Sequence, residues 1–141
     1  MHPNPSISVS AVVLTNDDGK VALVRKHHTT ALIFPGGKPE PGETGRAAAA
    51  RELQEELGVV VAAEALDHVG DYTTLAANEA ATQLFSQVYR GHLPSGQHAR
   101  AQAEIAELFW VDPMTVEAPA SYRLAPLSST VLYNLAHGRV R

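Results

Sequence analysis

The chain has 141 residues with no cysteine, 45% hydrophobic and 18% charged residues, and a formal net charge of −4 at pH 7. This length suits a single domain over residues 1–141 that buries roughly two-thirds of its unfolded surface, and so high a hydrophobic fraction excludes a disordered polyelectrolyte. The lack of cysteine excludes a disulfide framework, a thiolate metal site and a cysteine nucleophile. The acidic balance provides no overall basic field for a nucleic acid polymer, so a polyanionic substrate needs another source of positive charge.

Nothing in the sequence indicates secretion or membrane insertion. The N-terminal residues Met1–Pro5 contain no basic region followed by an apolar run. The apolar stretches are far shorter than the ~20 residues that a membrane helix needs. We therefore expect a cytoplasmic protein that makes no contact with a membrane.

The first part of the chain predicts three strands and a turn-rich loop. Ile7–Leu14 and Lys20–Arg25 are rich in apolar residues and flank Asn16–Gly19. An Asp-Gly turn between two such runs is typical of a hairpin. Ala31–Phe34 predicts a short strand, and the Pro- and Gly-rich residues 36–42 predict a loop.

A helix is expected after this loop. Arg46–Leu57 consists almost wholly of good helix formers, and the helix begins near Gly45. The Thr44 hydroxyl suits an N-cap, and Gly58 stands where a left-handed residue ends a helix. Val59–Ala63 then predicts a return to β structure.

The second half of the chain predicts further strands and a final amphipathic helix. The expected strands are Leu66–Leu75, Gln83–Leu93 and Leu108–Val111, and the expected helix is Pro126–His137. Strands followed by a helix, then strands and a helix again, favour an α/β fold with a mixed sheet that is covered by helices. Asp71–Ala81 predicts a loop over a substrate cleft.

Three glutamates share one face of the first predicted helix. Glu52, Glu55 and Glu56 stand at positions i, i+3 and i+4, whereas Leu53 and Leu57 lie on a different arc. Like charges at this spacing cost a few tenths of a kcal/mol each, so the pattern indicates a bound cation. Carboxylate oxygens suit Mg²⁺ or Mn²⁺, which also bind substrate phosphates.

The loop before this helix adds two kinds of group to the predicted site. Gly36 and Gly37 permit close backbone approach, so a carbonyl or amide can face a metal and its phosphates. Lys38 can contact a phosphate oxygen as a point charge. Glu43 lies just before the positive end of the helix.

Together these residues form an extended pattern that resembles the Nudix hydrolase signature. The matching residues are Gly37-x5-Glu43-x7-Arg51-Glu52-Leu53-x-Glu55-Glu56-x-Gly58-Val59. The resemblance implies an α/β/α sandwich with a central mixed β-sheet. It also implies Mg²⁺- or Mn²⁺-dependent hydrolysis of a nucleoside diphosphate linked to another group, in which water attacks a phosphorus atom.

The resemblance further assigns roles within the signature. Glu52 and Glu56 would be the firmest metal ligands, Glu55 would complete the site directly or through water, and the Gly36 carbonyl would also reach a metal. Arg51 would orient its neighbour Glu52. Glu43 would brace the junction of loop and helix, and Gly37 and Gly58 would have structural roles in the motif.

The identity of the general base stays open at this level. The resemblance allows a glutamate of the signature, Glu52 or Glu55, or an acidic residue outside it. The segment 103–111 resembles the family's stretch before a late strand, where an extra glutamate joins the metal site. We favour Glu104 in that role, with Glu107 as the alternative.

The substrate is less constrained than the reaction. The segment 34–38 (Phe-Pro-Gly-Gly-Lys) resembles that of enzymes acting on oxidised nucleoside triphosphates. A nucleoside triphosphate, with oxidised forms included, is therefore the first expectation, and ADP-ribose or another nucleotide sugar is the second. A domain that binds a nucleotide without cleaving it is a third reading. Arg25 is either a phosphate contact or a surface charge, and a homodimer is implied by the family alone.

Overall fold

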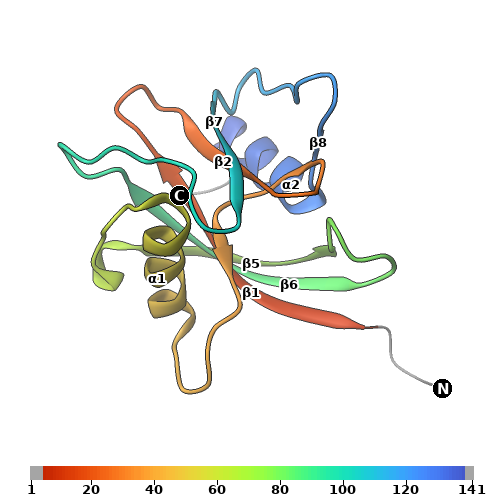
Figure 1. The fold of residues 1–141 in the computed structure, drawn as a ribbon, viewed down its shortest axis with the longest axis horizontal. Helices are drawn as coiled ribbons and strands as arrows, with labels where there is room; N and C mark the ends of the chain where they lie inside the picture. The colour runs from red at the N-terminus through yellow and green to blue at the C-terminus, as the bar shows by residue number, and fades with distance from the viewer. Residues whose placement is uncertain (1–4, 139–141) are drawn as a thin grey trace.

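The protein is described here from a computed structural model over residues 5–138. The segment 1–4, which bears on the expectation about secretion, lies outside the described residues. A central β-sheet separates two helices that lie on its opposite faces (Figure 1). This arrangement confirms the expected α/β/α sandwich.

The central sheet is mixed, as the sequence predicts. Its main path runs in the order β5, β6, β1, β2 and β7, and β4 pairs with β1. β1 is parallel to β6, whereas the other pairs are antiparallel. Its strands are β1 (Ser6–Thr15), β2 (Val21–Lys26), β4 (Gly36–Gly37), β5 (Asp67–Leu75), β6 (Gln83–His92) and β7 (Ile105–Val111). A second, two-stranded parallel sheet joins β3 (Ala31–Leu32) to β8 (Arg123–Leu124).

Strand β1 contributes side chains to both hydrophobic layers. Val12 and Leu14 pack in the layer beneath α1, whereas Ala11 and Val13 pack in the layer beneath α2. This alternation follows from the two-residue period of a strand. The two layers therefore share one strand as their common wall.

The two helices begin and end close to the predicted positions. Helix α1 is Gly45–Leu57, and the Thr44 hydroxyl accepts from the Ala47 amide at its N-terminus. Gly58 adopts the left-handed conformation, with φ 67°, and its amide donates to the Gln54 carbonyl. Helix α2 is Pro126–Ala136, and it begins with a proline, whose missing N–H is not needed in the first turn.

The glycine-rich loop is held inside the sheet because the chain passes between β1 and β2. Ile33 exchanges two backbone hydrogen bonds with Val24 of β2, at 2.7 and 2.9 Å. Four residues later the chain pairs with β1, where Gly37 lies opposite Ser10. These contacts fix the backbone of residues 33–37 before any ligand is bound.

Two predictions about local structure are wrong in their extent. Val59–Ala63 is not a strand. The backbone N–H and C=O of Val60 bond the side-chain amide of Gln97 instead of a neighbouring strand. A short 3₁₀ helix, Ala63–Ala65, follows. The loop predicted at Asp71–Ala81 is shorter, since β5 continues to Leu75.

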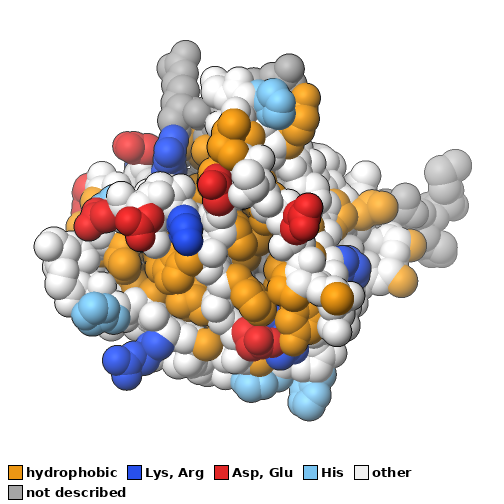
Figure 2. All heavy atoms as spheres, turned by 90° about the horizontal axis from the view of Figure 1, so that it is seen from above, with side chains coloured by type: hydrophobic (Ala, Val, Ile, Leu, Met, Phe, Trp, Pro, Cys, Tyr) orange, Lys and Arg blue, Asp and Glu red, His pale blue; other side chains and the backbone are white. Residues whose placement is uncertain are grey.

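The described surface has mixed character. Figure 2 shows acidic and basic side chains interspersed with apolar atoms on one face of the molecule. Among the described residues, no helix is long and apolar enough to cross a membrane.

Candidate active site

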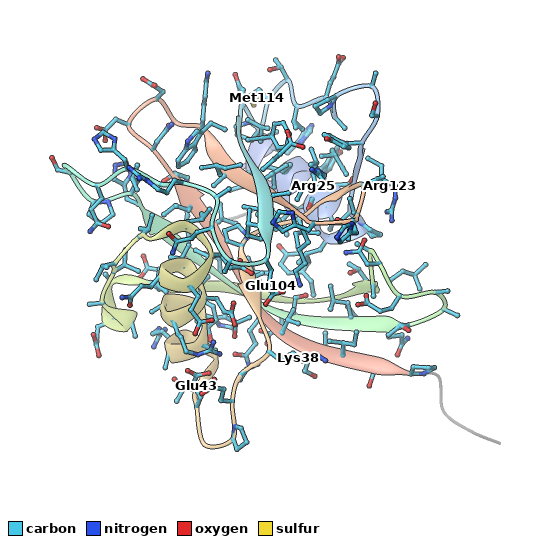
Figure 3. All side chains as sticks on the ribbon, in the orientation of Figure 1. Arg25, Lys38, Glu43, Glu104, Met114 and Arg123 are labelled. Atoms are coloured by element: carbon cyan, nitrogen blue, oxygen red, sulfur yellow. The ribbon has the colours of Figure 1, made fainter. Side chains whose placement is uncertain are left out.

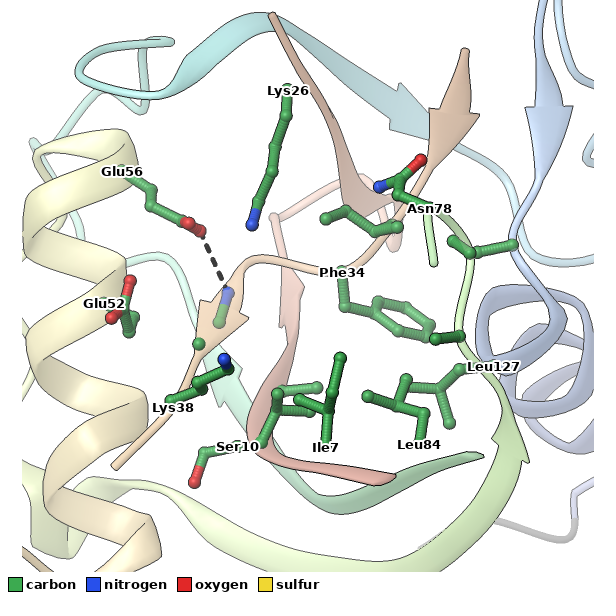
Figure 4. Close-up of a pocket in the computed structure, with 18 of the residues that line it drawn as sticks. Ile7, Ser10, Lys26, Phe34, Lys38, Glu52, Glu56, Asn78, Leu84 and Leu127 are labelled. Atoms are coloured by element: carbon green, nitrogen blue, oxygen red, sulfur yellow. Dashed lines mark hydrogen bonds between the residues drawn. The ribbon is translucent and has the colours of Figure 1, made fainter. Parts of the chain in front are cut away.

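Helix α1 turns two of its three glutamates toward a cavity of about 420 Å³. Glu52 and Glu56 line this cavity, one helical turn apart, and both face the 33–37 segment in Figure 4. Glu55 is outside the lining, and its half-exposed side chain pairs with Arg51 at 3.2 Å. The predicted acidic face is therefore divided between the cavity and the surface.

Glu56 is the most deeply buried of these carboxyl groups, with 4% of the residue exposed. Its Oε1 accepts a hydrogen bond from the Gly36 amide at 3.0 Å. The pKa of Glu56 is raised from 4.5 to about 7, mainly by burial and also by the charges of Glu52 and Glu104, against the opposing effects of the Gly36 hydrogen bond and Lys26. The ionised group therefore lacks the positive charge that would stabilise it.

Glu52 is in a similar position at the other end of the pair. Burial raises the pKa of its carboxyl, and the hydrogen bond from Arg51 at 2.9 Å opposes this increase. The negative charges of Glu55 and Glu104 also raise the Glu52 pKa. A Cβ atom on Gly37 would lie 2.6 Å from Glu52 Oε1, so only glycine leaves room for this carboxylate.

Arg51 connects the loop to the helix through several hydrogen bonds. Its guanidinium bonds both oxygens of Glu43, at 2.8 and 2.9 Å, and the Lys38 carbonyl at 3.2 Å. The hydrogen bond from Arg51 lowers the pKa of Glu43 to about 2. Glu43 in turn accepts from the Glu40 amide, which closes the loop. With this network in place, Arg51 keeps Glu52 facing the cavity.

Two lysines line the cavity beside these carboxylates. Lys38 is the cation that the sequence predicts, and Lys26 is one that it missed. Lys26 follows Arg25 on β2, so their side chains point to opposite faces of the sheet. The register shift beside them lies on β7, where Arg25 pairs with Glu107 and Lys26 with Ile105. The Lys26 ammonium lies 3.8 Å from a Glu104 oxygen, so Glu104 is also brought to the cavity.

Arg25 lies outside the cavity lining, so a phosphate contact there is not supported. Its guanidinium bonds Glu107 at 2.8 Å, donates to the Thr29 carbonyl and packs over the Tyr122 ring. The Tyr122 hydroxyl also donates to Glu107, at 2.5 Å. Figure 3 shows Arg25 on the side of the molecule that carries Arg123, away from the Glu43 loop. Glu107, the alternative candidate for general base, is held by these contacts and is not among the residues that line the cavity.

The far half of the cavity is apolar. Ile7, Phe34, Leu84 and Leu127 surround it, as Figure 4 shows. The segment 75–79 completes the wall, and Asn78 stands there above Phe34. One cavity thus joins a charged end that suits phosphates and metal to an apolar end that suits a planar ring.

The donor set at the charged end fits Mg²⁺ or Mn²⁺. The described residues contain no group of three or more acidic or histidine side chains already gathered as a metal cage. Mg²⁺ does not require such a cage, because it usually keeps several waters and binds one or two carboxylates plus substrate phosphates. The raised pKa values of Glu52 and Glu56 indicate two carboxylates that a cation would stabilise in their charged form.

Comparisons with known proteins agree with this geometry. The family model described as the NUDIX domain matches residues 5–131. The CTP pyrophosphohydrolase of Escherichia coli K12 is 30% identical over 130 residues, which cover 89% of this chain and 88% of that protein. An isopentenyl-diphosphate Delta-isomerase of Nocardia farcinica is 40% identical over 127 residues, which cover 79% of this chain and 70% of the relative. A solved structure described as a NUDIX hydrolase from Nitrosomonas europaea superimposes with a TM-score of 0.71 at 25% identity and covers 99% of this chain and 92% of that one.

Proposed function

Because the chain belongs to the Nudix family of hydrolases, we propose that it hydrolyses a nucleoside triphosphate at a phosphoric anhydride bond with the help of Mg²⁺ or Mn²⁺. The observation that carries this proposal is the pair Glu52 and Glu56. Glu56 is buried and Glu52 is partly buried, both have raised pKa values, and both face one cavity that is also lined by Lys26 and Lys38.

Each residue at the charged end has a proposed task. Glu52, Glu56 and the Gly36 carbonyl would hold the metal, which supplies charge neutralisation and a hydroxide near neutral pH. Lys26 and Lys38 bind phosphate oxygens. The metal and the two lysines would thus together neutralise the negative charge of the substrate phosphates.

The remaining acidic and basic side chains act around this core. Glu104 accepts the proton of the attacking water, because its carboxylate lies at the cavity. Arg51 fixes the orientation of Glu52. Arg51 holds the Glu55 carboxylate outside the cavity lining. Glu55 would therefore reach the metal through a water molecule rather than by direct contact.

A substrate panel tests this proposal. Purified protein with Mg²⁺ is incubated with the four common nucleoside triphosphates, 8-oxo-dGTP, ADP-ribose and isopentenyl diphosphate, and phosphate, pyrophosphate and nucleotide products are separated. We expect turnover of a nucleoside triphosphate and its loss in Glu56→Gln. Preferred hydrolysis of ADP-ribose would replace the substrate proposal, isomerisation alone would overturn it, and binding without turnover would indicate a nucleotide sensor.

The assembly and the location of the protein are two further proposals. We predict a homodimer from family membership, which sedimentation equilibrium tests directly. We also predict cytoplasmic activity on free nucleotides, which fractionation of the source cells tests.

A further inference from the structure

The loop between β5 and β6 has a defined shape at the apolar end of the cavity. The Ala76 amide donates to the Thr82 carbonyl at 2.8 Å, which closes the loop. The Thr82 hydroxyl donates to the Ala80 carbonyl at 3.1 Å from a nearly buried position. From outside the loop, the Arg123 guanidinium donates to the Ala77 carbonyl. The backbone of this loop is thus held at both of its sides.

This loop presents two polar side chains to the cavity. Asn78 and Glu79 both line it, and among the described residues neither has a hydrogen-bond or ion-pair partner. Ser128 also lines this end of the cavity, but its hydroxyl already donates to the Leu32 carbonyl at 2.8 Å. An amide and a carboxylate therefore stand free beside the apolar walls.

The chemistry of these two groups selects among nucleobases. A carboxylate accepts hydrogen bonds and cannot donate them. Guanine presents two adjacent donors on one edge, the ring N1–H and the 2-amino group, so a carboxylate can accept from both at once. Adenine and cytosine place one amino donor beside an acceptor nitrogen, and uracil places its single N–H between two carbonyl oxygens, so each would set a lone pair against the carboxylate.

We propose that Glu79 and Asn78 read the base of the nucleotide and that they select guanine. Glu79 accepts from N1–H and the 2-amino group, and the Asn78 amide donates to O6. Oxidation at C8 leaves this edge unchanged, so the 8-oxo form of guanine fits the same pair. Arg123 is a positioning residue that sets the loop. This inference rests on the proposed function, because it names the substrate class of the same cavity.

Direct binding tests the inference without any turnover. The dissociation constants of GMP, AMP, CMP and UMP are measured by calorimetry in EDTA. A bidentate contact discriminates between bases by about tenfold or more, so the wild type is expected to bind GMP at least about tenfold more tightly than UMP. Glu79→Gln should reduce this ratio about tenfold, and Asn78→Ala should reduce it by a smaller factor. Glu117→Gln, which removes the same charge outside the cavity, should leave it unchanged.

Arg123 provides a second and independent measurement. Arg123→Ala should lower the preference for GMP, whereas Arg123→Lys, which can still donate to the Ala77 carbonyl, should restore most of it. A structural defect alone would weaken the binding of all four nucleotides equally, and Arg123→Lys would not restore the preference for GMP.

The outcomes separate this inference from the proposed function. Equal binding of the four nucleotides, no measurable binding, or an unchanged ratio in Glu79→Gln would each overturn the reading of the base. A protein that prefers GMP and hydrolyses nothing would support this inference and contradict the proposed function. A protein that hydrolyses all four triphosphates equally would do the reverse.

Discussion

The buried carboxyl group of Glu56 has a measurable effect on the stability of the metal-free protein. Burial raises its pKa from 4.5 to about 7 in the folded state, whereas the unfolded chain returns it to its ordinary value. Between these two pH values the folded protein holds a proton that the unfolded chain has lost. The free energy of unfolding therefore falls as pH rises through this window, and at about 1.36 kcal/mol per pKa unit the total loss is on the order of 3 kcal/mol.

The variant Glu56→Gln isolates this term because it keeps the shape of the side chain and removes the charge. Its amide oxygen can still accept from the Gly36 amide. In EDTA at pH 8 we expect the variant to be more stable than the wild type by on the order of 3 kcal/mol, with the difference vanishing near pH 4.5. Urea denaturation at several pH values gives both curves. Glu64→Gln, at an exposed position, is the control and should show no such trend.

Two results would refute this reasoning. The first is a stability difference between Glu56→Gln and the wild type that is the same at pH 5 and pH 8. It would show that the pKa of Glu56 is not raised in the folded protein. The second is a wild type that is more stable than Glu56→Gln at pH 8 in EDTA. It would show that nearby groups of the protein already stabilise the ionised Glu56 carboxylate without a metal. Saturating Mg²⁺ should stabilise the wild type more than the variant, because the lost carboxylate weakens metal binding.

Three further variants test other parts of the site. Gly37→Ala should abolish measurable turnover while the fold is retained, because its Cβ would displace the Glu52 carboxylate, and circular dichroism with an activity assay checks both. Arg25→Ala should lower the melting temperature and leave KM unchanged, because Arg25 pairs with Glu107 rather than with the substrate. A large rise in KM would instead indicate that Arg25 contacts a substrate phosphate. Glu104→Gln should lower kcat by roughly 10²-fold or more with KM little changed, and an unaltered kcat would assign the base elsewhere.

The sequence predicted the features of the site that depend on neighbours along the chain. The Thr44 cap, the Gly58 terminus and the spacing of Glu52 and Glu56 all arise within a few turns of one helix. The 3.6-residue period alone places those two carboxylates on one face. A short segment of sequence therefore sufficed to indicate both the helix and its chemistry.

The remaining assignments depend on contacts between distant segments. Glu55 and Glu56 both belong to the predicted acidic face, and only the packing of the helix against the 33–37 segment shows that Glu56 is buried and accepts from the Gly36 amide. Likewise, Arg25 and Lys26 are adjacent cations on opposite faces of β2, and only the tertiary contacts show that Lys26 lines the cavity while Arg25 pairs with Glu107. Such contacts are not visible in the local sequence, which left Arg25 open between a phosphate contact and a surface charge and did not single out Lys26.

The shared strand β1 has a practical consequence for ligand discovery. A slip of one residue would exchange the side chains of both layers, so neither layer can rearrange while the other keeps its packing. Melting of the domain should accordingly be a single event, whichever end of the cavity is occupied. A compound at 100 times its dissociation constant would then raise the stability of the whole domain by about 2.7 kcal/mol. Thermal-shift screening can therefore detect metal, phosphate and base analogues with one readout, before any substrate is known.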